Sequence, residues 1–262
     1  MIANSKTSYD FTHPSFAKLP EFLKSINLHN PEDNRNGPFQ YANQVENPFD
    51  WLTEHPHVFQ AFHQYIHTIR ILRPSWIEMY PVQENLIQGV KLEGDSSVLV
   101  DIGGSVGTVL EDFRVRVPLY TGRLVLQELP GVIAAAKSMG LNSRIEPQVH
   151  DFLTPQPIKG ARAYFMRSIL HDWPDETCRT ILGHLKDVME PGYSRILINE
   201  CVVANEQAAW QHASLDLYMM ALGSSQERTE HEWRTLVESC GLKIAGIYSK
   251  GQGNESLIEV VI

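Results

Sequence analysis

The chain has 262 residues, with 22 Lys and Arg against 31 Asp and Glu, and its formal net charge at pH 7 is −9. This acidic balance, without any run of basic residues, argues against nucleic acid as a partner. The N-terminus lacks the apolar core of a signal peptide, and no window approaches the roughly 20 apolar residues of a membrane span. We therefore expect a soluble, cytoplasmic protein with no membrane partner, built as one large α/β domain, with or without a helical appendage.

Up to about Leu92 the sequence predicts helices that are separated by proline and asparagine. Asn47-Pro48 and His55-Pro56 have the form of helix starts. Apolar residues then recur at helical spacing, namely Phe59, Phe62, Ile66 and Ile69. We expect residues 1–92 to form a helical segment and residues 93–262 to form a separate domain.

From Ser97 onward, short apolar runs alternate with helical segments, which is typical of βαβ units and a mostly parallel sheet. The runs that predict strands are residues 98–102, 124–126, 164–166 and 196–198. Near the end, residues 242–248 and 257–262 are joined by a short loop that contains glycine, which predicts a hairpin with an antiparallel last strand. The predicted fold class is α/β.

The cysteines and histidine pairs give no metal or disulfide pattern. Cys178, Cys201 and Cys240 are isolated and odd in number, so we interpret them as buried small hydrophobic residues. His63 and His67 have the i, i+4 spacing of a zinc helix, but no third ligand is evident. We interpret them as ordinary residues of a helix face and expect no metal site.

A turn of small residues follows the first predicted strand. Asp101 precedes a glycine-rich stretch that comprises Gly103, Gly104, Ser105 and Gly107. Small residues let a ligand approach backbone N–H groups at a helix start. The stretch lacks the dinucleotide pattern G-x-G-x-x-G and fits Asp-x-Gly-x-Gly-x-Gly, with Ser105 in place of the middle glycine, which favours S-adenosylmethionine.

An acidic residue follows the second predicted strand. Glu128 lies roughly 25 positions after Gly103, close to the spacing of about 20 at which an acid reaches a ribose. By themselves, a glycine turn and an acid are equally compatible with a structural turn and a surface glutamate.

One histidine lies between a predicted inner strand and a predicted helix. Residues 161–166 are apolar and bulky, and Pro174 with two following acids is a good first turn of a helix. His171 would therefore project from a short turn at the carboxyl edge of the sheet, where open α/β folds build ligand sites. We interpret His171 as a candidate base and Asp172, Asp175 and Glu176 as acids that cap the helix.

With these pieces in place, the chain from about Ser15 to Ile262 resembles the small-molecule O-methyltransferases of the caffeate type, particularly their fungal relatives. The motifs that carry the resemblance are residues 100–107, 127–130, 151–157, 167, 171–176, 199–201 and 226–229. The resemblance implies a class I methyltransferase fold, in which a Rossmann-like, seven-stranded sheet with an antiparallel last strand follows a helical segment. It also implies S-adenosylmethionine as cofactor and S-adenosylhomocysteine as product.

The same resemblance implies roles for individual residues. His171 would take a proton from a phenolic hydroxyl, and Glu200 and Glu227 would orient its imidazole. A histidine of reference pKa about 6.5 suits this task, because a sulfonium methyl needs little beyond in-line positioning and one base. The residues implied to bind the cofactor are Asp101, Gly103, Gly104, Ser105, Gly107, Glu128, Leu129, Asp151, Phe152 and Arg167.

For the acceptor, the resemblance implies a flat aromatic molecule, such as a phenol or polyketide of secondary metabolism. The residues at matching positions are Phe62, Ile66, Met166, Asp172, Met219 and Met220. At helical spacing, apolar residues of this kind belong to a core at least as often as to a pocket.

Relatives in this family carry an N-terminal winged-helix dimerisation domain, and the present sequence matches the part after it. We accordingly expect either a homodimer or a separate partner protein that replaces this domain. Two further functions stay open: an S-adenosylmethionine-assisted pericyclase or isomerase, which loss of the base would favour, and a non-catalytic partner subunit.

Overall fold

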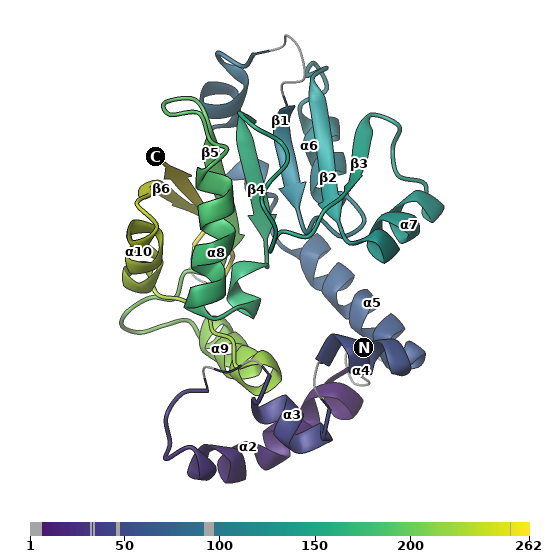
Figure 1. Cartoon of the computed structure of the whole chain (residues 1–262), viewed down its shortest axis with the longest axis vertical. Helices are drawn as coiled ribbons and strands as arrows, with labels where there is room; N and C mark the ends of the chain where they lie inside the picture. Colours follow the sequence, from purple (N-terminus) through teal and green to yellow (C-terminus); the bar gives the residue numbers. More distant parts are fainter. Residues whose placement is uncertain (1–6, 32, 34, 46–47, 92–96, 252) are drawn as a thin grey trace. The chain divides into compact units, whose positions relative to one another are not determined.

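The computed structural model describes residues 7–262 except 32, 34, 46–47, 92–96 and 252. The chain forms two compact units (Figure 1). Unit 1 comprises residues 1–74, 171–174 and 203–229, and unit 2 comprises residues 75–170, 175–202 and 230–262. The boundary that we predicted at residue 92 stays a prediction.

Unit 1 is helical. Its elements are η1 (Thr7–Thr12), α2 (His13–Ser25), α3 (Pro38–Asn43), α4 (Pro48–Glu54), α5 (Pro56–Leu72) and α9 (Trp210–Gly223). The predicted helix starts at Pro48 and Pro56 are confirmed, because a proline without an N–H group fits the first turn of a helix.

An aromatic core holds unit 1 together. Phe11, Phe39, Leu52 and Val58 are buried in one cluster, and the rings of Phe11 and Phe39 lie 5.1 Å apart. Although α9 is far away in the sequence, it packs on α2 and α3. The backbone of Gly37 comes so close to Ser224, directly after α9, that a side chain at position 37 would overlap with the serine hydroxyl.

Unit 2 contains a seven-stranded sheet, in the order β3-β2-β1-β4-β5-β7-β6. The strands are β1 (Ser97–Ile102), β2 (Arg123–Glu128), β3 (Ile145–Val149), β4 (Ala163–Arg167), β5 (Arg195–Glu200), β6 (Lys243–Ser249) and β7 (Ser256–Val261). β7 runs antiparallel to both of its neighbours, whereas β1 to β5 pair in parallel. The predicted fold class, hairpin and antiparallel last strand are confirmed.

One strand was missing from the sequence prediction. Among the described strands, β3 pairs only with β2, at the edge of the sheet, and it contains Pro147. Proline cannot donate to a strand ladder, so it weakens the strand pattern in the sequence and is tolerated at an edge.

Helices pack against the sheet of unit 2, and buried aromatic rings lie between one of these helices and the sheet. The helical elements of unit 2 are η2 (Trp76–Glu78), η3 (Gln83–Ile87), α6 (Thr108–Arg116), α7 (Pro130–Ser138), α8 (Asp175–Lys186) and α10 (Glu230–Ser239). α6 contacts β1 and β2, and α10 contacts α8 and β6. Trp76 is buried 5.0 Å from the ring of Phe165 on β4 and stacks on Phe113 of α6, so these rings join α6 to the sheet.

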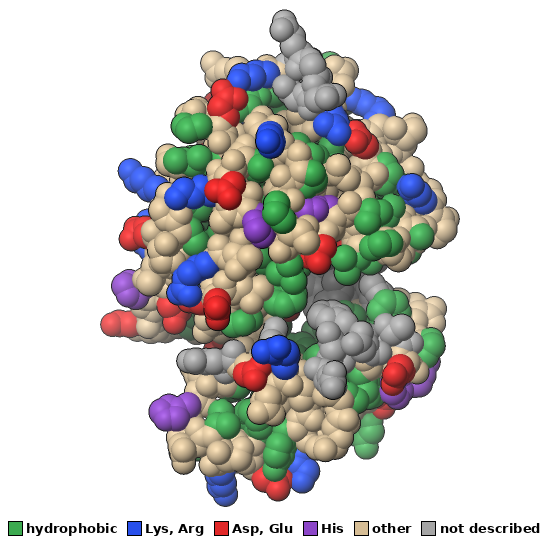
Figure 2. Space-filling model, in the orientation of Figure 1, with side chains coloured by type: hydrophobic (Ala, Val, Ile, Leu, Met, Phe, Trp, Pro, Cys, Tyr) green, Lys and Arg blue, Asp and Glu red, His purple; other side chains and the backbone are tan. Residues whose placement is uncertain are grey.

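The described residues bear on three further expectations, which concern surface charge, membrane-spanning helices and the burial of the cysteines. On the face drawn in Figure 2, basic and acidic side chains are intermixed. No helix in the described part of the chain combines the length and apolar character that crossing a bilayer requires. Cys178 and Cys201 are buried as predicted, whereas the prediction is wrong for Cys240, which is only partly buried.

Candidate active site

The turn after β1 has an unusual backbone. Gly103 and Gly107 have φ of 64° and 83°, and Ser105 has φ of 57°, so three residues adopt the left-handed region. Glycine reaches this region without steric cost, whereas Ser105 occupies it against its preference. Gly104 has another reason to be small, because a Cβ there would overlap with the Asp101 carboxylate and lie 2.6 Å from Leu126. The turn therefore requires small residues by its own geometry.

Glu128, at the end of β2, joins this turn to the neighbouring strand. One carboxylate oxygen accepts a hydrogen bond from the Ser105 N–H at 3.1 Å, and the other accepts one from the Leu129 N–H at 2.9 Å. Since β1 and β2 run in parallel, their carboxyl ends meet at one edge of the sheet. The half-buried Glu128 carboxylate is thus held beside the glycine turn.

The residues that follow β3 lie at the same edge. The exposed Asp151 accepts a hydrogen bond from the Leu153 N–H at 2.9 Å, and the next residue, Phe152, is half-buried. The Leu129 side chain is 52% exposed. Burial lowers the pKa of the neighbouring His150, and the negative charge of Asp151 opposes this shift. This edge therefore presents two carboxylates and a partly exposed aromatic ring, which are groups that can hydrogen-bond and stack on a nucleoside.

Arg167 ends β4 and forms an ion pair that the sequence did not reveal. Its guanidinium lies 2.8 Å from a carboxylate oxygen of Glu255, and the two side chains are 14% and 7% exposed. Glu255 directly precedes β7, so the pair ties β4 to the hairpin. The predicted cofactor role of Arg167 stays a prediction.

Replacing Glu255 with glutamine is expected to lower the free energy of unfolding by about 3 kcal/mol, because it leaves the Arg167 charge buried without its counter-ion. Urea unfolding measures the change. Glu230→Gln is the matched control, since Glu230 pairs with Arg234 at 2.7 Å on the surface and its loss should cost less than about 1 kcal/mol. Equal losses in the two variants would contradict the prediction.

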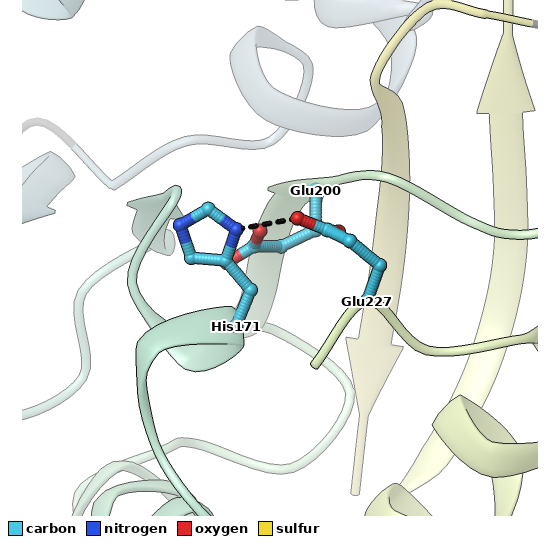
Figure 3. A group of neighbouring side chains, drawn as sticks. All are labelled: His171, Glu200 and Glu227. Atoms are coloured by element: carbon cyan, nitrogen blue, oxygen red, sulfur yellow. Dashed lines mark hydrogen bonds and ion pairs between the residues drawn. The ribbon is translucent and has the colours of Figure 1, made fainter. Parts of the chain in front are cut away.

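His171 lies in unit 1, on the single turn Leu170–Asp172 that follows β4. Its Nδ1 lies 2.7 Å from an oxygen of Glu227, whose side chain is fully buried (Figure 3). Because a carboxylate only accepts hydrogen bonds, Nδ1 carries a proton and donates it, and in the neutral imidazole the lone pair is on Nε2. The nearest oxygen of Asp172 lies 3.6 Å from Nε2, too far for a hydrogen bond.

Backbone contacts hold the His171–Glu227 pair in place. The Gln226 N–H donates to the His171 carbonyl at 3.2 Å, and the Glu227 N–H donates to Asp216 of α9 at 2.9 Å. The Arg228 side chain also donates to the Trp173 carbonyl at 3.0 Å. Two segments that are more than fifty residues apart are thus joined on both sides of the pair.

Asp172 and Glu200, the other two acids predicted to lie at the site, have different surroundings. Burial raises the pKa of Asp172 above its ordinary value, the charge of His171 lowers it, and Glu227 raises it further. Glu200 belongs to unit 2, where one carboxylate oxygen accepts the N–H groups of Ile169 and Leu170 at 2.9 and 3.0 Å. Glu200 therefore fixes the backbone immediately before His171, and its predicted contact with the imidazole stays a prediction.

The predicted acceptor residues are divided between the units. Phe62 contacts Phe11 in the core of unit 1, at 5.7 Å between rings, and Met219 on α9 is buried beside the half-buried Met220. Met166 is fully buried in the sheet of unit 2. The side chain of Ile66 lies outside the described residues, as do those of His63 and His67.

The sequence reasoning missed two acids: Glu255, which pairs with Arg167, and Asp216, which accepts the hydrogen bond of the Glu227 N–H. No local pattern could have identified either residue, because Glu255 lies 88 residues from Arg167, and Asp216 lies 11 residues before Glu227, outside the spacing of a helical turn. By contrast, the sequence did identify both members of the His171–Glu227 pair, through the family motifs.

The family assignment comes from a comparison with known proteins. A model of the O-methyltransferase domain matches residues 42–243. The chain is 39% identical over 256 residues to O-methyltransferase mpaG of Penicillium roqueforti (strain FM164), which covers 96% of this chain and 64% of that protein.

Two solved structures agree with this assignment. "A Pericyclic Reaction enzyme" and "The structure of LepI complex with SAM" each give a TM-score of 0.88 at 29% identity, over 99% of this chain and 66% of theirs. The chain thus spans somewhat less than two thirds of the length of these proteins. The matched residues, the sheet order and the motifs together show that the chain belongs to the O-methyltransferase domain family.

Proposed function

We propose that this chain transfers a methyl group from S-adenosylmethionine to a hydroxyl of an aromatic small molecule or polyketide of secondary metabolism. The observation that carries the proposal is the 2.7 Å bond between His171 Nδ1 and Glu227, which assigns Nε2 as the atom of the neutral imidazole that can accept a proton. The family membership and the O-methyltransferase activity named for mpaG support the same reaction.

The residues at the carboxyl edge of unit 2 fit the cofactor. Asp101, Gly103, Gly104, Ser105 and Gly107 belong to the turn that would hold the methionine part, and this turn packs so closely that it requires small residues. Glu128 and Leu129 would meet the ribose, and Asp151, Phe152 and Arg167 the remaining adenosine. The solved structure of LepI with SAM supports this choice of cofactor. When bound, S-adenosylmethionine supplies an electrophilic methyl group.

In the proposed reaction, the chain's own residues move one proton and hold a second one in place. His171 Nε2 removes the proton of the acceptor hydroxyl as its oxygen becomes a nucleophile. Glu227 keeps the Nδ1 proton in place and stabilises the imidazolium that forms, as in other pairs of a base and an orienting carboxylate. Glu200 positions the backbone before His171.

Phe62, Ile66, Met166, Asp172, Met219 and Met220 are the proposed acceptor residues. Five of them are apolar carbon or thioether side chains that would suit a flat aromatic acceptor. A homodimer, or a complex with a separate protein, stays a prediction.

A pericyclic reaction is the second candidate function. It is favoured by the similarity to the structure named "A Pericyclic Reaction enzyme", at a TM-score of 0.88. In that case the bound cofactor would stay intact. The imidazole of His171 would not need to remove a proton, and its substitution should then leave the rate nearly unchanged.

The experiment that separates the two candidates uses S-adenosylmethionine with a labelled methyl group and a panel of phenols and aromatic polyketides. We expect a labelled product and one molecule of S-adenosylhomocysteine for each methyl group transferred. Mass spectrometry measures both. Cofactor binding in calorimetry without any label transfer would favour the pericyclic reaction. The cofactor assignment would be contradicted if neither S-adenosylmethionine nor S-adenosylhomocysteine gave a heat of binding or thermal stabilisation.

A further inference from the structure

A buried pair of glutamines lies beside the proposed cofactor residues. Gln127 on β2 is 1% exposed, and Gln156, on the segment between β3 and β4, is 5% exposed. Their side-chain amides bond reciprocally, with Gln127 Nε2 donating to Gln156 Oε1 at 2.7 Å and Gln156 Nε2 donating to Gln127 Oε1 at 2.9 Å. Buried amides that bond to each other in this way restrict both side chains to one arrangement.

The direction of these bonds follows from the backbone. The Ile158 N–H donates to Gln156 Oε1 at 3.1 Å, so this atom must be the oxygen. Gln127 must then present its NH₂ group to Gln156, and its second amide hydrogen goes to Gln148 Oε1 on β3 at 2.7 Å. Both amide hydrogens of Gln127 are therefore used, one for the edge strand and one for the segment after it.

The end of β2 also holds the other proposed cofactor segments. The Gln127 carbonyl accepts the Gly103 N–H at 2.9 Å, and the Glu128 carbonyl accepts the His150 N–H at 3.1 Å. The segment of residues 150–158 is thus bonded to β2 near its start, through His150, and near its end, through Gln156. Between these bonds, residues 153–155 are exposed and belong to neither a helix nor a strand. Asp151 and Phe152 lie between the two bonded ends, and His184 Nε2 of α8 lies 3.2 Å from the Leu153 carbonyl oxygen.

We propose that Gln127 and Gln156 are a positioning pair for the adenosine half of the cofactor. By bonding residues 150–158 to the strand end that carries Glu128, the pair sets where Asp151 and Phe152 lie relative to the ribose acid. This inference rests on the proposed function, because it assigns the ligand of that segment as adenosine. Neither glutamine contacts the reacting groups in this scheme.

The test replaces Gln156 with methionine, which has a similar length and removes the bonds to Gln127 and Ile158. We expect S-adenosylhomocysteine to bind about tenfold more weakly, because only a fraction of the molecules would hold the segment in its binding position. The affinity for adenosine alone should fall by the same factor, since the substitution affects the binding of that half of the ligand. Calorimetry measures both affinities, and hydrogen exchange of the Ile158 amide should become faster without ligand.

Gln148→Met is the matched control. It removes one hydrogen-bond partner of Gln127 but has no bond to residues 150–158, so both affinities should stay within about twofold of the wild type. Equal loss of affinity in the two methionine variants, or an unchanged affinity in Gln156→Met, would overturn the positioning pair alone. A wild-type chain that binds neither ligand would instead overturn the proposed function together with this inference.

Discussion

Replacement of His171 with alanine is expected to lower the turnover of methyl transfer by about 10²- to 10⁴-fold, which is the usual contribution of a general base. The affinity for S-adenosylhomocysteine should change little, since the proposed cofactor residues all lie in unit 2. Turnover by label transfer and affinity by calorimetry measure the two effects. His231→Ala is the matched control, because His231 is exposed on α10 and should leave both quantities unchanged.

The pH dependence of turnover provides a second test of the base. Turnover should rise with pH, because only the unprotonated Nε2 accepts a proton. The Glu227 carboxylate at 2.7 Å favours the imidazolium, so the midpoint of this rise should move to lower pH in Glu227→Gln. Undiminished methyl transfer in His171→Ala, or an unchanged midpoint in Glu227→Gln, would contradict the role of the pair and assign the base to another residue.

Gly104→Ala is expected to weaken the binding of S-adenosylhomocysteine by about 10- to 100-fold, in line with the cost of overpacking a closely packed site. The new Cβ would overlap with the Asp101 carboxylate and lie 2.6 Å from Leu126, so the turn must move away from β1 and β2. Asp101 is 1% exposed and cannot move into solvent without distorting the strand. Calorimetry measures the affinity, and circular dichroism shows whether the variant is folded.

Gly183→Ala is the control for this substitution. Gly183 lies within α8, and a Cβ there would meet no atom within 4 Å. Alanine should therefore raise the free energy of unfolding by about 0.5–1 kcal/mol through helix propensity and leave the affinity unchanged. A folded Gly104→Ala variant with wild-type affinity would show that the turn does not hold the cofactor.

The sequence by itself determined the elements whose patterns are local. Pro48 and Pro56 marked helix starts, because their missing N–H groups and fixed φ suit a first helical turn. The apolar runs predicted four parallel strands, and the loop near Gly251 predicted the hairpin of β6 and β7. β3 was missed because Pro147 interrupts its pattern. The family motifs predicted the site residues, including both members of the His171–Glu227 pair.

The tertiary structure alone decided which of these groups meet. His171 and Glu227 are 56 residues apart, and Arg167 and Glu255 are 88 apart, so no short window contains either pair. The bond between Gln127 and Gln156 likewise depends on how β2, β3 and the segment after them pack. A local pattern encodes backbone conformation and the buried face of an element. The partner of a buried polar group depends instead on strand order and packing, which are properties of the whole fold.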